Sequence, residues 1–196
     1  TGHALVAKLA DSKYQRVHKV TIIPRGRALG LAVSLPEKDA YSRGRGWLLD
    51  RVKIAYGGYV AEDMFYAETT TGTQNDLQQA TDLARRMVTD WGMSDMGPVA
   101  YAQEDEPIFL GKEIARHKDY SEHTAQAIDR EVTRILTECL NEARAILNEH
   151  KDQLERLTAE LVEKETLTDA EVREVLGFPE SGPVNASDES PGDDTP

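Results

Sequence analysis

Apolar residues recur every three or four positions over much of this chain, the spacing that places them on one face of an α-helix. The longest stripe follows Ser121, a favourable N-cap residue, so we predict a long helix that begins there. Its apolar positions are Ala125, Ile128, Val132, Ile135, Cys139, Ala143 and Ile146. A second amphipathic helix is predicted from the leucines that continue this spacing, Leu154, Leu157 and Leu161.

Three further helices are predicted in the first half of the chain, over residues 1–10, 45–66 and 75–91. Gly92 follows the third, at a position where helices commonly end. Near the other end of the chain, Thr168-Asp169-Ala170-Glu171 has the pattern of a capping box and predicts a last helix, with Gly177 beyond its end.

Gly57-Gly58 lies inside the helix predicted over residues 45–66. Each glycine costs about 1 kcal/mol relative to alanine in a helix interior. Two adjacent glycines therefore indicate either the close approach of another backbone or a break in the helix.

Two short segments have the character of strands. Residues 17–23 include the β-rich run Val20-Thr21-Ile22-Ile23, and residues 29–35 form a second run that ends before Pro36. The turn Pro24-Arg25-Gly26-Arg27 separates them, which predicts a β-hairpin or a small sheet. The expected fold is therefore mainly α, with a small hairpin or sheet near the N-terminus.

The composition changes after residue 179. Residues 180–196 are small, polar and acidic and carry no apolar stripe, so we predict a disordered acidic tail. Residues 1–179 form the single predicted folded domain. Within it, the segments 98–101 and 108–110 fit either short strands or loop.

The net charge, the lack of a long apolar run and the single cysteine disfavour several classes of function. The chain of 196 residues has a formal net charge of −12, which disfavours binding to nucleic-acid phosphates. No apolar run approaches the roughly 18 residues needed to span a bilayer. Cys139 is the only cysteine, so no intrachain disulfide can form, and its place in an apolar stripe indicates a small buried side chain rather than a nucleophile.

His3 is the first candidate for chemistry. Zinc peptidases with the motif H-E-x-x-H place two histidines on one helical face, and the glutamate between them acts as general base. A lone histidine near the start of a helix usually has no such role. Thr1-Gly2-His3 nevertheless fits the last three residues of this motif, in which case its first histidine and its glutamate would precede Thr1.

Two carboxylates are further candidates. Asp76, at the start of a predicted helix, either complements the helix dipole or serves as a zinc ligand beside two histidines. Glu62 is either a charge on the helix surface or an acceptor that orients a zinc-bound imidazole. The residues alone favour the first alternative for both. The remaining histidines have no ligand spacing and are expected to be structural or exposed: His18, His117, His123 and His150.

Several motifs, in this order along the chain, resemble the peptidase domain of the FtsH family, the membrane-anchored AAA-type zinc proteases. They are Gly2-His3-Ala4-Leu5-Val6-Ala7, His18-Lys19-Val20-Thr21-Ile22-Ile23-Pro24-Arg25-Gly26, Gly57-Gly58-Tyr59-Val60-Ala61-Glu62, Asn75-Asp76-Leu77 and Ala84-Arg85-Arg86-Met87-Val88. The resemblance covers about residues 1–176 and identifies residues 1–179 as a zinc peptidase domain.

The resemblance implies a role for each candidate. His3 resembles the second zinc histidine, Asp76 the carboxylate ligand, and Glu62 a buried glutamate beside the metal. The implied cofactor is zinc, and the implied reaction is attack on a peptide carbonyl by zinc-activated water, with a glutamate moving the proton. The strand that includes Gly30, Leu31, Ala32 and Val33 resembles an edge that pairs with an extended substrate peptide.

The resemblance also implies partners. The family acts on unfolded protein substrates, as a homohexamer, fed by an ATP-using module that precedes this domain. Transmembrane helices at the N-terminus anchor the parent protein and leave this domain, itself soluble, on the cytoplasmic or organelle-interior face. None of these parts is expected within the 196 residues.

One departure from the family pattern matters for activity. The first histidine and the glutamate of the zinc motif are absent from the chain, so we expect the isolated 196 residues to be inactive and to bind zinc weakly. The alternative is a catalytically dead helical module that keeps oligomer contacts through residues 121–165. The two residues that precede Thr1 in the gene separate these interpretations, because His-Glu there supports the enzyme.

Overall fold

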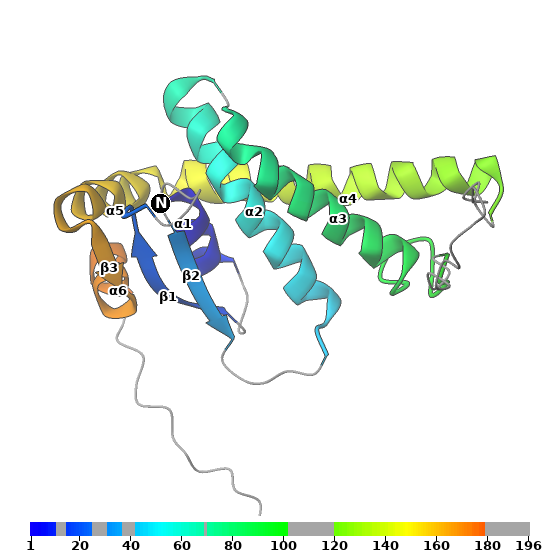
Figure 1. The fold of residues 1–196 in the computed structure, drawn as a ribbon, viewed down its shortest axis with the longest axis horizontal. Coiled ribbons are helices and arrows are strands. Elements are labelled where there is room, and N and C mark those ends of the chain that lie inside the picture. Colours follow the sequence, from blue (N-terminus) through cyan, green and yellow to red (C-terminus); the bar gives the residue numbers. More distant parts are fainter. Residues whose placement is uncertain (11–14, 25–30, 37–41, 69, 102–119, 179–196) are drawn as a thin grey trace, which may run out of the picture.

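Helices make up most of the structure, a computed structural model that describes residues 1–10, 15–24, 31–36, 42–68, 70–101 and 120–178 (Figure 1). In chain order the elements are α1 (Gly2–Leu9), β1 (Gln15–Thr21), β2 (Leu31–Pro36), α2 (Arg45–Tyr66), the 3-10 turn η1 (Thr71–Thr73), α3 (Gln74–Thr89), α4 (Glu122–Glu149), α5 (Lys151–Lys164), β3 (Thr166–Thr168) and α6 (Asp169–Leu176). The expected fold, mainly α with a small sheet, is confirmed.

Helix α2 is the centre of the helical part. It packs against α1, α3 and α4, and Figure 1 shows α2 and α3 lying across the long α4. Its bounds are those predicted from the sequence, and it continues without a break through Gly57-Gly58. The side chains that fill the core between these helices are fully buried: Leu5, Val6, Val52, Val60, Ala84, Val88, Ile128 and Ile135.

Helix α4 begins where the sequence predicts. The Ser121 hydroxyl accepts a hydrogen bond from the backbone N–H of Thr124 at 3.2 Å, which satisfies one of the free donors of the first turn. The predicted apolar stripe is buried as far as Ala143. Beyond it Leu147 is fully buried while Ile146 is only partly so, because the buried face continues by a step of four residues to the end of the helix.

The sheet has three strands in the order β2-β1-β3, and β1 pairs antiparallel with both neighbours. Val20 of β1 lies opposite Ala32 on one side and Leu167 on the other. The sequence predicted the first two strands but not β3. Three residues between two helices are too short to show an alternating pattern.

The last helix, α6, packs against α5, β1 and β3 and is joined to α1 by an ion pair. The capping box at Thr168 and Glu171 is present, and Gly177 takes the left-handed conformation with φ 71°. Asp169, in the first turn of α6, forms an ion pair with Lys8 of α1, whose side chain is only 6% exposed. Burial works to raise the pKa of Asp169, but hydrogen bonds from Lys8 and Arg173 lower it.

A buried carboxylate holds the turn after α3 against α4. Glu131 is 9% exposed, and it accepts a hydrogen bond from the backbone N–H of Asp95 at 3.0 Å. Arg134 donates to both of its carboxylate oxygens, at 2.7 and 2.8 Å. The hydrogen bonds from Arg134 are the main reason that the pKa of Glu131 is lowered.

The described residues test only some of the remaining sequence predictions. Residues 98–101 form no strand, and Tyr101 instead donates its backbone N–H to the carbonyl of Thr89 at 2.7 Å. Residues 108–110 and the predicted tail at 180–196 lie outside the described part, so the boundary at residue 179 stays a prediction. Among the helices that the structure describes, none has the length and apolar character to cross a membrane.

Candidate metal centre

His3 lies in the first turn of α1, where this helix meets α2. Its Nδ1 atom is 2.7 Å from the backbone carbonyl oxygen of Ile54. A carbonyl oxygen can only accept a hydrogen bond, so Nδ1 carries the hydrogen and donates it. In the neutral ring, Nε2 then has a free lone pair, which is the form that binds a metal.

Asp76 lies in the first turn of α3 and meets His3 from the other side. Its Oδ2 atom is 3.2 Å from Nε2 of His3, and both side chains are about one-third exposed, at 29% and 33%. The candidate ligands that the sequence analysis named therefore converge on one point, although they come from separate helices.

The hydrogen bond from His3 to the carbonyl of Ile54 limits what can lie between Nε2 of His3 and Oδ2 of Asp76. With the hydrogen on Nδ1, a neutral His3 presents a lone pair to the carboxylate of Asp76, and two acceptors at 3.2 Å repel each other. The contact is favourable when a positive charge is present, either a second proton on the ring or a cation held by both groups. Two ligand atoms bound tetrahedrally to one zinc ion are about 3.4 Å apart, so the pair fits that ion.

The pair alone does not complete a zinc site. Among the described residues, no group of three or more His, Cys, Asp or Glu side chains is placed to hold a metal ion. Structural and catalytic zinc sites use at least three protein ligands. At least one further donor is therefore needed beside His3 and Asp76.

Glu62 is hydrogen-bonded to Thr70 rather than to the His3 ring. Its Oε2 atom accepts hydrogen bonds from the backbone N–H and the hydroxyl of Thr70, at 3.0 and 3.1 Å. Thr70 is the N-cap of η1, the turn that leads directly into the helix of Asp76. Glu62 thus fastens the C-terminal part of α2 to the segment that carries Asp76.

The acceptor that orients the His3 ring is the carbonyl of Ile54. This carbonyl lies about two helical turns before Glu62 on α2, and the role of Glu62 beside a zinc-bound imidazole stays a prediction. A backbone carbonyl has no signature of its own in a sequence. Only the crossing of α1 over α2 reveals it.

The crossing itself depends on glycines that face each other. A Cβ atom built on Gly2 would lie 2.1 Å from the carbonyl oxygen of Gly57, and one built on Gly57 would lie 2.8 Å from the carbonyl oxygen of Gly2. Neither position has room for a side chain. The paired glycines in α2 therefore mark the close approach of another backbone, the first of the two alternatives drawn from the sequence.

Strand β2 is one edge of the described sheet, and β3 is the other. Leu31, Ala32 and Val33 belong to it and pair with Thr21, Val20 and Lys19 of β1. Gly30 lies outside the described residues.

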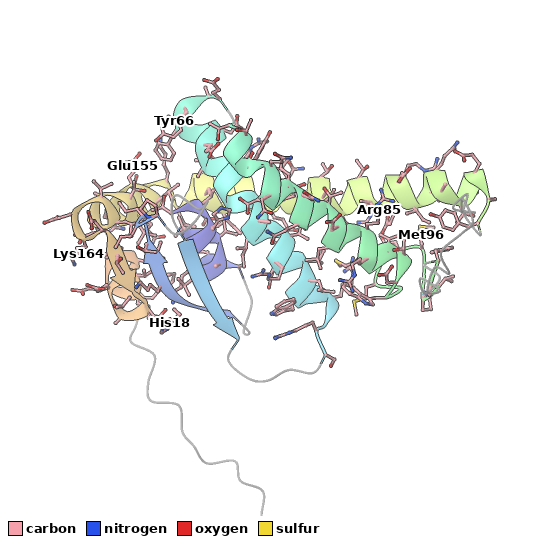
Figure 2. All side chains as sticks on the ribbon, viewed as in Figure 1. His18, Tyr66, Arg85, Met96, Glu155 and Lys164 are labelled. Carbon is pink, nitrogen blue, oxygen red and sulfur yellow. The ribbon has the colours of Figure 1, made fainter. Side chains whose placement is uncertain are left out.

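The other described histidines occupy separate positions on β1 and at the two ends of α4. His18 is exposed on β1 at the periphery of the molecule (Figure 2), His123 is exposed in the first turn of α4, and His150 joins α4 to α5. His117 lies outside the described residues.

Cys139 is a buried residue of the α4 stripe. Its thiol is 2% exposed and contacts the carbonyl of Leu49 at 3.8 Å. Burial raises the pKa of this thiol to about 11. A thiol that stays protonated at neutral pH is a poor nucleophile, which agrees with the interpretation from the sequence.

Comparisons with known proteins agree with these motifs. The sequence model for peptidase family M41 matches residues 1–175. The chain is 56% identical over 178 residues to the ATP-dependent zinc metalloprotease FtsH of Borreliella burgdorferi (strain ZS7), which covers 90% of this chain and 28% of that protein.

Two other relatives show the same pattern. The ATP-dependent zinc metalloprotease FtsH 4 of Sorangium cellulosum (strain So ce56) is 48% identical over 90% of this chain and 28% of its own length. The ATP-dependent zinc metalloprotease FtsH 1 of Rhodopirellula baltica (strain DSM 10527 / NCIMB 13988 / SH1) is 48% identical over 90% of this chain and 26% of its own. The chain thus spans between a quarter and a third of the length of these relatives.

Proposed function

This chain belongs to peptidase family M41, and on that premise we propose that it forms part of a zinc-dependent endopeptidase that cleaves proteins. The observation that carries the proposal is the convergence of His3 Nε2 and Asp76 Oδ2 at 3.2 Å, with the other ring nitrogen held by a carbonyl. Such an arrangement leaves Nε2 and a carboxylate oxygen aimed at one position, as two ligands of a single cation require.

His3 and Asp76 would be two of the zinc ligands. We propose that the remaining histidine and the general-base glutamate come from residues outside these 196, one turn ahead of His3 on the same helix face. A zinc ion held there supplies Lewis-acid chemistry, which polarises a peptide carbonyl and makes water a better nucleophile. The described residues hold and orient that ion.

Glu62 has a positioning role in this proposal. Its two hydrogen bonds to Thr70 fix the turn before α3 relative to α2. The same helix holds His3 through the Ile54 carbonyl. Because both proposed ligands are held by the same helix, α2, the distance between them is set before a metal binds.

The substrate would bind at the edge of the sheet. Residues 31–33 belong to the edge strand β2, which has main-chain donors and acceptors on the side away from β1. The proposed substrate-binding segment also includes Gly30, outside the described residues. An extended peptide can add there as a further strand, and main-chain pairing accepts many sequences. This suits an enzyme that degrades unfolded proteins.

The parent protein is proposed to be longer and to work as an assembly. The relatives are named ATP-dependent, and this chain covers less than a third of each. We propose that an ATP-using module precedes this domain, that a homohexamer forms, and that N-terminal transmembrane segments anchor it with this domain on the cytoplasmic or organelle-interior face. The 196 residues alone would then bind zinc weakly and be inactive.

The test uses the full-length protein encoded by the gene. Zinc content and casein cleavage with and without ATP are measured for it, for Asp76→Ala and for Asp82→Ala, an exposed aspartate on the same helix. The proposal predicts about one zinc per chain and ATP-dependent cleavage in the unmodified protein and in Asp82→Ala, with both lost in Asp76→Ala.

Other outcomes reject parts of the proposal. Zinc retained at full affinity in Asp76→Ala would remove Asp76 from the site. A full-length protein that binds no zinc and cleaves nothing would leave the helical interaction module as the function.

A further inference from the structure

The His3 ring lies against a position on α2 that has no side chain. A Cβ atom built on Gly58 would be 2.3 Å from Nε2 of His3, 2.6 Å from Cε1 and 3.2 Å from Cδ2. The edge of the ring that faces Asp76 thus occupies the space that any other residue at position 58 would fill. Gly58 is one helical turn after Ile54, whose carbonyl holds the opposite edge of the ring.

Gly57 and Gly58 face different parts of α1. Around Gly57, the nearest atoms to an added Cβ are backbone atoms of Gly2 and His3, at 2.8 to 3.0 Å. Around Gly58, the nearest atoms all belong to the imidazole. A side chain at 57 would push the two helices apart, whereas a side chain at 58 would turn one ring about its χ angles and leave the helices in place.

We propose that Gly58 and the carbonyl of Ile54 are the positioning elements of the metal-binding histidine. The carbonyl of Ile54 fixes the hydrogen on Nδ1. Gly58 has no side chain, so the ring can occupy the position in which Nε2 faces Asp76. This inference rests on the proposed function, since it assigns a task to α2 at the proposed zinc site. It explains why two glycines are adjacent in a helix where helix packing needs only the first.

The alternative is that Gly58 serves helix packing alone, as Gly57 does. The packing role and the positioning role predict different effects of a methyl group at position 58. A packing role predicts lower stability with unchanged metal binding per folded molecule. A positioning role predicts weaker metal binding with little change in stability, because the ring is the far end of a side chain that can rotate away.

The experiment compares Gly58→Ala with Gly46→Ala in the full-length protein. Gly46 lies on the same helix, and a Cβ atom there meets nothing within 4 Å. Zinc affinity is measured by competition with a chelator, the ligand geometry by the visible absorption of the Co²⁺-substituted protein, and stability by thermal unfolding of the metal-free protein.

For Gly58→Ala we expect zinc affinity to fall about 10- to 100-fold, the range found when groups that orient ligands are removed. We also expect the Co²⁺ bands to shift and the unfolding temperature to stay near that of the unmodified protein. Gly46→Ala should leave the affinity and the spectrum unchanged. Unchanged affinity and an unchanged Co²⁺ spectrum in Gly58→Ala would overturn the inference.

A double-mutant cycle covers the case in which Gly58→Ala is poorly folded or the protein binds no zinc. If the ring is what the new methyl group meets, the loss of stability from Gly58→Ala disappears in a His3→Ala background. A loss that persists there would show that the methyl group meets backbone, and the inference would fail. This cycle needs no metal, so its result is independent of whether the proposed peptidase function stands.

Discussion

The Nε2 atom of His3 lies 3.2 Å from Oδ2 of Asp76, at the point where the first turn of α1 meets the first turn of α3. Both partners are held by α2, one through the carbonyl of Ile54 and the other through the hydrogen bonds that Thr70 donates to Glu62. The spacing of the proposed ligands is therefore a property of one helix and the two segments attached to it. Several measurements follow from this dependence.

Removal of the Glu62 carboxylate should weaken zinc binding without abolishing it. Glu62→Ala removes the acceptor of two hydrogen bonds that Thr70 donates, so the turn before Asp76 is less well fixed, and we expect zinc affinity to fall about tenfold. Chelator competition measures this loss. Asp76→Ala, which removes a ligand, should show a far larger one.

Two variants test whether Glu62 affects zinc binding through its hydrogen bonds with Thr70. Glu68→Gln changes an exposed carboxylate just after the same helix and should leave zinc affinity unchanged. Thr70→Val removes the hydroxyl that Glu62 accepts from, so its effect and that of Glu62→Ala should be non-additive. Fully additive effects would mean that Glu62 acts on the metal by another path.

Alanine at position 2 should destabilise the fold. Its Cβ would lie 2.1 Å from the carbonyl oxygen of Gly57 and 2.8 Å from Cβ of Ala61, so α1 and α2 must separate. Overpacking of this kind costs about 1–3 kcal/mol, and thermal unfolding should show it. Gly46→Ala, in open space on α2, should instead stabilise the helix by about 0.5–1 kcal/mol, and equal unfolding temperatures for the two variants would contradict the crossing geometry.

The ion pair between buried Glu131 and half-buried Arg134 should make stability depend on acid pH. The pKa of Glu131 is lowered on folding, chiefly by its hydrogen bonds with Arg134, so its contribution is present above the usual carboxyl pKa of about 4.3 and is lost as pH falls through the lower folded value. We expect Glu131→Gln to cost about 1–3 kcal/mol at pH 7. The difference from the unmodified protein should shrink below about pH 4, as measured by urea unfolding across pH.

Glu138→Gln is the matched control for that pair. Glu138 also bonds to Arg134, at 2.8 Å, but its side chain is 55% exposed. An exposed ion pair contributes about 0.5 kcal/mol or less. A cost for Glu138→Gln as large as that for Glu131→Gln would show that burial of Glu131 is not the source of its contribution.

Cys139 should resist alkylation in the native state. Because burial raises the pKa of its thiol to about 11, almost no thiolate is present at pH 8, and the side chain is 2% exposed. Mass spectrometry after iodoacetamide treatment should find the thiol unmodified in native protein and modified in urea. Rapid labelling of native protein at pH 8 would contradict the packing of α4.

The thiol also gives stability a dependence on alkaline pH. The folded pKa lies above the unfolded one, so the thiol favours the folded state below the unfolded pKa of about 8.5, and this contribution is lost as pH rises toward about 11. Cys139→Ala should remove this part of the alkaline loss of stability. Parallel pH profiles for the two proteins would show that Cys139 ionises equally easily in both states.

The sequence predicted the long elements because each has a local signal, whereas His3 and Asp76 became candidate ligands through the family resemblance. The bounds of α2 follow from its apolar spacing, and the start of α4 and α6 from Ser121 and the capping box. His3 and Asp76 were candidates from their motifs. Their contact depends on tertiary packing, which no spacing along the chain encodes.

Other features of the site and core left no local signal. The carbonyl of Ile54 is invisible in a sequence because every residue has one. Glu131 is a charged residue between apolar positions, and its burial depends on Asp95 and Arg134 as partners. The third strand was not predicted because three residues are too few to show an alternating apolar pattern, and its partner β1 lies near the other end of the chain.

That late strand has a consequence for synthesis. β1, α1 and the sheet edge at β2 are made first, but β1 gains its second neighbour, and Lys8 its partner Asp169, only when residues 166–169 have left the ribosome. Contacts between distant parts of a chain form late, after the cost of closing the long loop. A nascent chain would therefore leave one side of β1 without its strand partner until residues 166–168 have emerged, so that edge is open to pairing with other extended segments for most of the synthesis of this domain.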